Sequence, residues 1–424
     1  MQKLKYLLLP TIIIVCCFLS INANKYPEKL IWSDMEGYYI YLPAVFIYDG
    51  FKKEAVKDTA YLREYPGTNI IYSKYTSGVA LLEFPFFLIA HWLSKPLGYP
   101  ADGHSQIYSY GLMAAGIFYL LTGLLLLWNV ILQYYNKRTA AIALIGLAAG
   151  TNLYYYSFFQ PSMSHVYSFF LFASLIYITE KLIRVAKTNE RLPISTWILL
   201  GLVSGFIILT RPTNIIVLLY PLYRWAKDCS NKKQFLQSNL KGLLLAIAVF
   251  LLPFIPQVLY WQHVSGKSFL WSYGNESFLY WKEPKLIRVL IDPWNGWLLY
   301  SPIVLFPLIG LVAARKENKH AERIILFIIA VATYLFASWW AWWFGGAFGH
   351  RSYVEFYSLL ALPFAALISS IEKKKALFIS FLCIAALLIY YNLGLTYHYN
   401  PPWDGPNWTY ESLWTEIKKL FFFL

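Results

Sequence analysis

Residues 107–132 read IYSYGLMAAGIFYLLTGLLLLWNVIL and contain no Asp, Glu, Lys or Arg. A membrane's hydrocarbon core needs about 20 consecutive apolar residues per helix, so this stretch predicts a transmembrane helix. The whole chain has the same character, because 58% of its 424 residues are hydrophobic and 19% are aromatic. A soluble domain of this length cannot bury so much apolar surface. The sequence therefore predicts an all-α polytopic membrane protein.

About eleven apolar stretches have the length and composition expected of transmembrane helices. They lie near residues 6–22, 107–132, 139–156, 164–183, 194–210, 212–225, 241–260, 296–314, 322–341, 354–371 and 376–395. No fixed-period repeat and no appended soluble domain is visible, so residues 1–424 are expected to form one integral membrane domain. Three segments are expected outside the membrane: a large first loop, 24–106, a second loop, 261–295, and a C-terminal tail, 396–424.

The basic residues predict the orientation, because Lys and Arg in short loops are retained on the cytoplasmic side. Six runs hold more than half of the 36 Lys and Arg residues: 3–5, 136–138, 181–191, 224–241, 315–323 and 373–375. Along the predicted spans these runs alternate with external segments, of which the short ones, around 157–163, 211 and 351, hold only Arg211 and Arg351. The formal charge of +14 thus reflects topology, and it indicates no nucleic-acid partner.

Residues 78–92, GVALLEFPFFLIAHW, test this scheme because they are nearly long enough to span. If they crossed the membrane, every later basic loop would change sides. Glu83 and Pro85 also disfavour a span. We therefore expect an interfacial or partly embedded helix within the first external loop.

The first span has two interpretations. Lys3 and Lys5 precede an apolar run and Ala23 could mark a cleavage site, as in a signal peptide. An uncleaved anchor is preferred here, because it would tie the following acidic segment to the membrane surface. The four cysteines have no spacing that suggests a metal site or a disulfide in an external loop. Their scarcity and the short loops fit a bacterial inner membrane.

The segment WSDMEGYY, residues 32–39, places two carboxylates directly after the first span. Asp34 and Glu36 would face one side of an extended chain, but on a helix they diverge by about 200°. Such carboxylates can act as a general base or bind a divalent cation. The simpler interpretation is a solvated helix start, with Tyr38 and Tyr39 in an interfacial aromatic belt.

Two further segments carry an arginine near the external boundary. Arg211 lies in TRPTN, 210–214, and Arg351 follows three glycines in GGAFGHRSY, 345–353. The planar guanidinium suits a phosphate, and glycines allow the backbone to approach a ligand. Alternatively, the arginine at 211 could extend to lipid headgroups and the glycines could form only a tight turn.

Histidine and tryptophan add two weaker signals. His165 follows Gln160 to Ser164 at the start of a predicted helix and could bind a phosphate or sugar hydroxyl, or be a hydrated helix cap. The run WWAWW, residues 339–343, could stack on a sugar or anchor the chain at the interface. Ionisable residues at membrane depth commonly mark a substrate path.

The assembled pattern resembles the GT-C superfamily of membrane glycosyltransferases. The resemblance rests on the acidic first loop, the Tyr-rich segment ending in PSMSH at 161–165, the TRPTN hairpin and the GG-x-x-G-x-R turn. It extends from residue 5 to about 395. More narrowly, the chain is similar to bacterial relatives of dolichyl-phosphate-mannose protein mannosyltransferases and of lipid A aminoarabinose transferase.

The resemblance implies transfer of a sugar from a polyprenyl-phosphate donor to a lipid, glycan or protein acceptor, at the periplasmic face of the inner membrane. Asp34 would be the catalytic carboxylate, with Glu36 a second acidic residue. The order Asp-Met-Glu departs from the adjacent Asp-Glu of many relatives and leaves the role of the second residue open. Lys74, Arg211 and Arg351 would bind the donor phosphate. Residues expected to contact substrate are Tyr38, Tyr39, His165, His350 and Glu355, and a divalent cation, Mg²⁺ or Mn²⁺, remains an open possibility.

Two other classes of function stay open at this stage. A lipid-linked substrate transporter or flippase would also carry charges on helix edges, but it would be expected to have mid-membrane ionisable residues and broken, repeated helices. A non-catalytic membrane subunit of an envelope assembly is the third possibility. A donor-dependent activity assay distinguishes the three.

Overall fold

The computed structural model describes residues 2–57, 62–188, 191–312, 319–400, 403 and 405–422, without the side chains of 2–9, 319, 320 and 422. The side chains of Lys3 and Lys5 and the whole of Arg315, which belong to the predicted basic runs, lie outside the described part.

The described chain is built from helices, with one two-stranded hairpin. The first α-helices are α1 (Gln2–Ala23), α2 (Asp34–Tyr39), α3 (Tyr41–Phe46), α4 (Gly78–Ser94), α5 (Gln106–Ile131), α6 (Lys137–Gly150), α7 (Leu153–Phe158), α8 (Ser164–Thr188), α9 (Ile194–Thr210) and α10 (Leu219–Asp228). They are followed by α11 (Lys232–Phe250), α12 (Phe254–Ser265), α13 (Leu286–Ile291), α14 (Trp297–Tyr300), α15 (Leu305–Val312), α16 (Lys319–Ser338), α17 (Tyr357–Ile371), α18 (Lys375–His398) and α19 (Tyr410–Phe422). The 3₁₀ helices are η1 (Pro27–Lys29), η2 (Lys53–Ala55), η3 (Pro212–Leu218), η4 (Pro302–Val304), η6 (Arg351–Phe356) and η7 (Gly405–Asn407). Strands β1 (Arg63–Glu64) and β2 (Ile71–Tyr72) pair antiparallel in the first external loop.

Six helical segments of the described chain are long and apolar enough to cross a membrane. They are α5, α8, α11 with α12, most of α16, η6 with α17, and α18, while α4, α9, α15 and most of α1 are shorter apolar helices. This inventory agrees with the expected multi-pass membrane protein. The number of about eleven spans stays a prediction, because the shorter helices do not reach the same length.

Two expected spans, 241–260 and 296–314, are interrupted at a proline, and a third proline stands at the start of the expected span 212–225. Pro212 opens η3 before α10, Pro253 lies between α11 and α12, and Pro302 opens η4 before α15. Proline lacks the backbone N–H that an α-helix interior needs, so it is favoured where a helix begins. The expected span 139–156 also differs, because α6 ends at Gly150 and α7 is a separate short helix.

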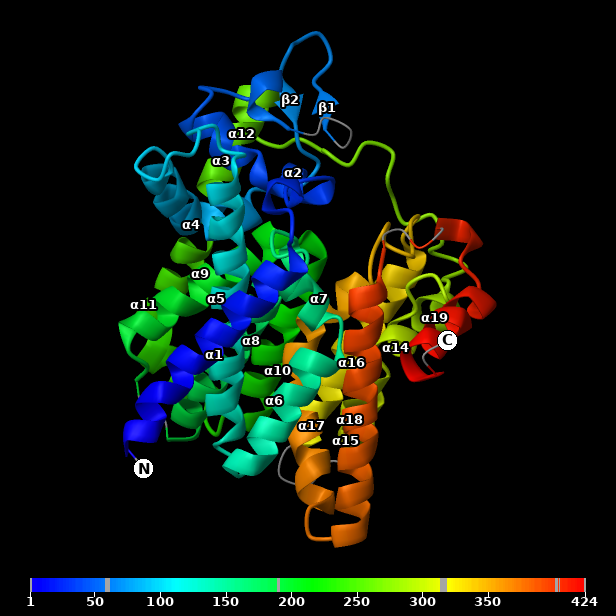
Figure 1. Cartoon of the computed structure of the whole chain (residues 1–424). Helices are drawn as coiled ribbons and strands as arrows, with labels where there is room; N and C mark the ends of the chain where they lie inside the picture. The colour runs from blue at the N-terminus through cyan, green and yellow to red at the C-terminus, as the bar shows by residue number, and fades with distance from the viewer. Residues whose placement is uncertain are drawn as a thin grey trace.

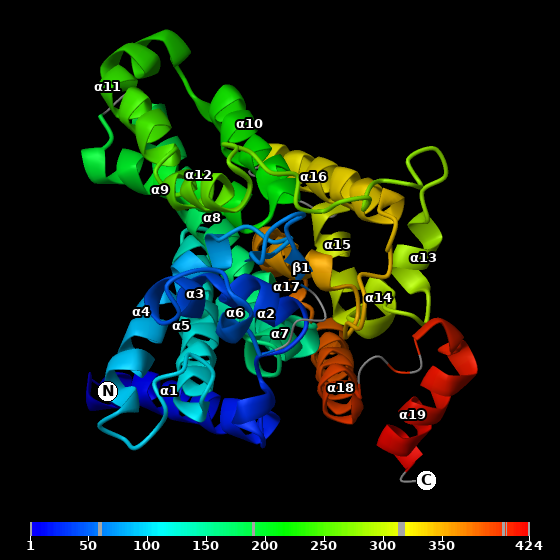
Figure 2. The ribbon, with the colours of Figure 1, turned by 90° about the horizontal axis from the view of Figure 1, so that it is seen from above.

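Helix α8 forms the centre of the bundle. It packs against α5, α9, α10 and α17, and most of its apolar stretch is buried inside the protein. Helices α11 and α18 lie at the periphery, where most of their apolar side chains remain accessible, as expected for surfaces that face lipid. Figure 2, which looks along the bundle, shows α11 and α18 on opposite sides of the molecule.

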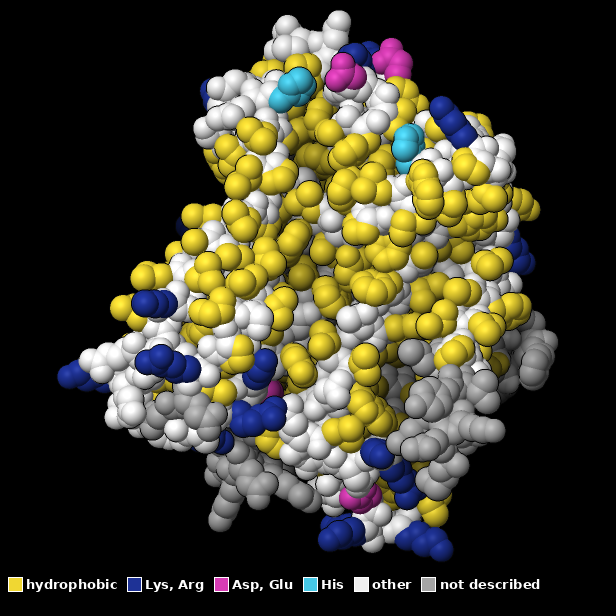
Figure 3. Space-filling view, turned by 90° about the vertical axis from the view of Figure 1, so that its left-hand side faces the viewer, with side chains coloured by type: hydrophobic (Ala, Val, Ile, Leu, Met, Phe, Trp, Pro, Cys, Tyr) yellow, Lys and Arg dark blue, Asp and Glu magenta, His cyan; other side chains and the backbone are white. Residues whose placement is uncertain are grey.

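The two ends of the bundle differ in character. Helices α2, α3 and α12 and the β-hairpin lie together at one end, at the top of Figure 1. On the face drawn in Figure 3, a broad hydrophobic band crosses the middle. Most Lys and Arg side chains on this face gather toward the bottom, at the end opposite the β-hairpin. Helix α4 packs along α5 and contacts α2, α3, α8 and α9. The interfacial placement expected for this helix stays a prediction.

Candidate functional site

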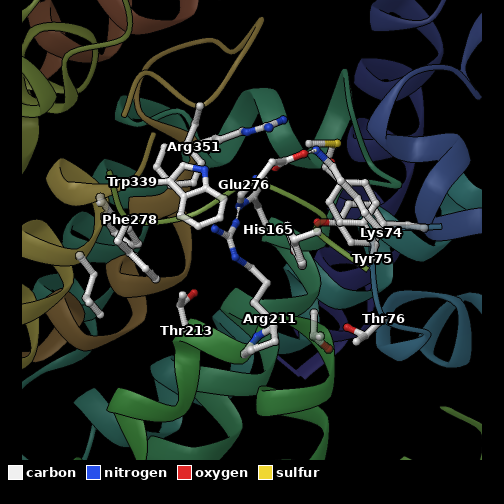
Figure 4. A pocket seen from close by; sticks show the side chains of 18 of the residues that line it. Lys74, Tyr75, Thr76, His165, Arg211, Thr213, Glu276, Phe278, Trp339 and Arg351 are labelled. Carbon is white, nitrogen blue, oxygen red and sulfur yellow. Dashed lines mark hydrogen bonds and ion pairs between the residues drawn. The ribbon is translucent and has the colours of Figure 1, made fainter. Parts of the chain in front are cut away.

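A cavity of about 250 Å³ lies at the end of the bundle that carries α2 and the β-hairpin. Its wall combines three cationic side chains with a group of aromatic rings (Figure 4). The lining residues are Tyr38, Lys74, Tyr75, Thr76, Met163, His165, Thr210, Arg211, Pro212, Thr213, Trp271, Tyr273, Glu276, Phe278, Leu335, Phe336, Trp339, Phe344 and Arg351. The first loop, the start of α8, the junction of α9 with η3, the second loop and the segment after α16 thus meet here.

Local sequence explains how the two arginines reach the cavity. Helix α9 ends before Arg211, whose extended backbone (φ −151°, ψ 110°) leads into Pro212 and η3. Arg351 follows a turn in which Gly345 and Gly349 have φ values of +73° and +61°, a conformation that favours glycine. A Cβ on Gly349 would also come within 2.8 Å of the Tyr300 side chain.

Asp34 forms an ion pair with Arg351 at the edge of the cavity. The arginine Nη2 lies 2.8 Å from the Asp34 Oδ2, and both side chains are largely buried. Burial raises the pKa of the Asp34 carboxyl, but the positive charges of Arg351 and Lys74 more than offset it, and the net pKa lies below the usual value. Asp34 therefore stays ionised, and the carboxylate can accept a proton.

Arg211 and Glu355 form a second pair inside the protein. Arg211 Nε lies 3.3 Å from Glu355 Oε1, and its Nη2 donates to the Ser352 hydroxyl at 3.0 Å. His165 lies between these groups, with Nδ1 at 3.1 Å from Arg211 Nη1 and 3.2 Å from Glu355 Oε2. A carboxylate and a guanidinium thus fix the position of the imidazole at the cavity wall.

Lys74 is the third cation and also has an acidic partner. Its Nζ lies 3.2 Å from Oε1 of Glu276, which belongs to the segment 261–295. Arg63 approaches the same carboxylate at 3.5 Å, and the Trp340 indole N–H donates to it at 3.4 Å. The Ser272 hydroxyl also donates to the Lys74 carbonyl at 2.7 Å, so the segments 24–106 and 261–295 are joined beside the cavity.

Tyr38 reaches the cavity, but its neighbours in the acidic segment do not. The Tyr38 ring stacks on Tyr75 with centroids 4.1 Å apart, and its hydroxyl donates to the Ser164 hydroxyl at 3.2 Å. Tyr39 is fully buried and donates to the Gly103 carbonyl at 2.6 Å. Glu36 is also fully buried, with Oε1 3.1 Å from His104 Nε2.

Asp34 and Glu36 therefore do not form a pair. Both lie on α2, and residues two positions apart on a helix are rotated by about 200°, so the two side chains diverge. His350 likewise lies behind the wall, where its Nε2 is 3.0 Å from the Trp342 carbonyl oxygen. Of the residues expected at the site, the cavity holds Tyr38, Lys74, His165, Arg211 and Arg351, with Asp34 and Glu355 paired to two of them. Glu36, Tyr39 and His350 pack elsewhere.

The second loop supplies cavity residues that the sequence did not single out as a site. No role was predicted for Tyr75, Tyr273 or Glu276, all of which line the cavity. Trp339, which also lines the cavity, belongs to the tryptophan run 339–343, for which stacking on a sugar is one interpretation. These residues reach the cavity because the segments 24–106 and 261–295 contact each other, and the spacing of residues in a single sequence does not reveal such a contact.

The side chains near the cavity are poorly arranged to bind a divalent cation. Among the described residues, no group of three or more His, Cys, Asp or Glu side chains comes together in a way that could hold a metal ion. Asp34 and Glu36 diverge, and Asp34 is paired with Arg351. The two carboxylates of the first loop thus do not fit the joint ligation of Mg²⁺ or Mn²⁺, which prefer several oxygen ligands.

Comparison with known proteins gives a structural likeness but no sequence match. No family model and no curated protein matches the chain. An archaeal oligosaccharyltransferase, AglB from Archaeoglobus fulgidus in complex with an inhibitory peptide and a dolichol-phosphate, is similar over 92% of this chain and 55% of its own, with a TM-score of 0.49 and 13% identity. The apo form of an Archaeoglobus fulgidus oligosaccharyltransferase gives a TM-score of 0.48 and 13% identity over 91% of this chain and 55% of its own. The chain thus spans about half the length of these proteins.

Proposed function

We propose that this protein is a membrane glycosyltransferase that uses a polyprenyl-phosphate-linked sugar as its donor. The observation that carries the proposal is the meeting of Asp34 with three cations, Lys74, Arg211 and Arg351, around one cavity with an aromatic wall. Cations suit the donor phosphate, whose leaving oxygen gains negative charge in a poorly solvated place. A carboxylate beside them suits activation of an acceptor.

The reaction would be an inverting displacement at the anomeric carbon of the donor sugar. An acceptor hydroxyl or amine forms the new bond to this carbon while the bond to the phosphate oxygen breaks. Asp34 takes the acceptor proton, and the electron pair of the broken bond stays on polyprenyl phosphate. Arg211 and Arg351 stabilise that anion with fork-shaped guanidinium groups, and Lys74 adds a point charge.

The proposed location is a bacterial inner membrane, with the cavity facing the periplasm. Support comes from the Lys and Arg side chains, most of which gather, on the face drawn in Figure 3, at the end of the bundle opposite the β-hairpin. The acceptor is a lipid, a glycan or a protein segment that approaches between the external loops. Membrane lipids surround the peripheral helices.

A donor-dependent assay on purified protein tests the proposal. Polyprenyl phosphates carrying labelled hexoses or pentoses are supplied with lipid, glycan and peptide acceptors, and release of polyprenyl phosphate is measured with transfer of the label. Mass spectrometry of the glycans lost on deleting the gene identifies the natural product. Movement of the donor across vesicles without bond cleavage would favour a flippase instead, and absence of any donor use would favour a non-catalytic subunit.

A further inference from the structure

One wall of the cavity combines an indole with a carboxylate. Trp339 follows the last residue of α16 and lines the cavity, with Phe278 and Tyr273 packed around it in edge-to-face geometry at centroid distances of 5.1 and 6.1 Å. Glu276 lines the same cavity. In Figure 4, the Trp339 indole lies on the side of the cavity opposite Lys74 and Tyr75.

Contacts between the second loop and the end of α16 hold this wall in place. The backbone N–H of Trp340 donates to the Ser277 carbonyl, and the backbone N–H of Tyr280 donates to the Ser338 carbonyl, each at 3.0 Å. The Glu276 carboxylate is fixed by Lys74 and by the indole N–H of Trp340. The indole and the carboxylate are therefore preorganised, which lowers the entropic cost of binding a ligand between them.

The chemistry of the wall favours a sugar over a hydrocarbon chain. A prenyl chain would replace water around the Glu276 carboxylate and offer it no hydrogen-bond donor, which is costly. A sugar ring offers hydroxyl donors to such a carboxylate and polarised C–H groups to the negative face of an aromatic ring. We propose that Trp339 and Glu276 form the subsite for the glycosyl ring of the donor, an inference that rests on the proposed glycosyl transfer.

This subsite changes when the phosphate binds. Lys74 is paired with Glu276, so a phosphate that approaches Lys74 competes with the carboxylate for the same ammonium group. As the phosphate takes the lysine, the carboxylate loses this partner but keeps its contacts with Arg63 and the Trp340 indole N–H, so it can accept hydrogen bonds from the sugar hydroxyls. Glu276 therefore opposes binding of bare polyprenyl phosphate and favours binding of the sugar-bearing donor.

Binding measurements on the full-length protein in lipid nanodiscs separate these effects. The probes are polyprenyl phosphate and the same lipid phosphate carrying glucose, galactose, mannose or arabinose. The readout is the dissociation constant of polyprenyl phosphate divided by that of the sugar-bearing lipid, for the sugar that binds most tightly. We expect Trp339→Leu to reduce this ratio by about 3- to 10-fold while the dissociation constant of polyprenyl phosphate changes little. Trp343→Leu is the matched control, because Trp343 stacks on Trp294 and does not line the cavity.

Glu276→Gln gives a second, independent signature. We expect polyprenyl phosphate to bind this variant more tightly than the wild type, while the sugar-dependent ratio falls by about 10-fold, since the charge-assisted hydrogen bonds are lost. Equal weakening of both probes by Trp339→Leu would assign the wall to the prenyl chain and overturn the inference. A wild type that gains no affinity from any of the four sugars would also overturn it. A wild type that neither binds polyprenyl phosphate nor transfers sugar would instead reject the proposed function.

Discussion

Arg351 and Asp34 are ion-paired at the edge of the cavity, with Nη2 of the arginine 2.8 Å from Oδ2 of the aspartate. The pair joins the start of α2 to the start of η6, which are far apart in the sequence. It keeps a carboxylate ionised in a largely buried place and also holds a guanidinium beside the cavity. Acceptor activation and stabilisation of the leaving phosphate are thereby coupled in the proposed mechanism.

Asp34→Asn tests the proposed base. The amide has nearly the same shape but cannot take the acceptor proton, so we expect turnover to fall by about 10²-fold or more. Glu36→Gln is the matched control on the same helix, because Glu36 contacts His104 away from the cavity, and it should retain most of the turnover. Transfer rate is measured in detergent, with donor binding determined separately. If the Asp34→Asn protein is folded and fully active, then Asp34 has only a structural role at the start of α2.

The pH dependence of transfer provides a test of the ion pair. Because the pKa of Asp34 lies below its usual value, its carboxylate should remain active down to the normal carboxyl range near pH 4. In Arg351→Gln only Lys74 of these two cations remains to offset the cost of burial, so the pKa of Asp34 rises and the acid limb of the rate profile should move to higher pH. The ion pair also contributes to folding stability with a pH dependence of the same direction. This contribution is fully present above the pKa of the aspartate in the unfolded chain, near 3.9, and is lost as the pH falls through the lower pKa of Asp34 in the folded protein. An unchanged acid limb in the variant would separate Asp34 from the rate-determining proton transfer.

Arg211 requires a variant that avoids an orphaned charge. Removing Arg211 alone leaves Glu355 buried without its partner, which costs about 3–5 kcal/mol in comparable pairs. The double variant Arg211→Gln with Glu355→Gln removes both charges, and we expect it to fold while the donor KM rises by about 10-fold or more. Arg211→Lys should restore only part of donor binding, because the charge remains but the fork is lost. Donor kinetics unchanged in all these proteins would assign the arginine to headgroup anchoring.

The sequence predicted the membrane character, but it did not predict the ion pairs around the cavity. Long apolar stretches are local signals, and six helical segments of the described chain are long and apolar enough to cross a membrane. Whether Asp34 and Glu36 face one side depends on where α2 begins, which their spacing leaves open. The partners of Arg211 and Lys74, namely Glu355 and Glu276, come from distant segments, and a single sequence carries no signal for such contacts.

Glu83 on α4 is predicted to support the position of His165. Its Oε1 accepts hydrogen bonds from the Ser162 hydroxyl at 2.6 Å and the Tyr167 hydroxyl at 2.8 Å, on either side of the histidine. Glu83→Ala leaves both hydroxyls without this acceptor, so we expect a loss of stability of roughly 1–3 kcal/mol per hydroxyl and weaker donor binding. Glu83→Gln keeps an acceptor oxygen and should be milder in thermal unfolding and in transfer. Equal stability of the alanine and glutamine variants would contradict this role.

The last prediction concerns the side of the membrane on which α4 and its following loop lie. If α4 is interfacial, residues 95–105 are external, and cysteines at Lys95 and Ser105 should react with an impermeant reagent in intact spheroplasts. Ser94 is unsuitable for labelling because its side chain is fully buried. The background protein lacks Cys16, Cys17, Cys229 and Cys383, and a cysteine at Lys374 serves as the control that should label only after lysis. Labelling of Lys95 and Ser105 only after lysis would mean that the first loop is not wholly external, and the cavity would then face the cytoplasm or α4 would span the membrane.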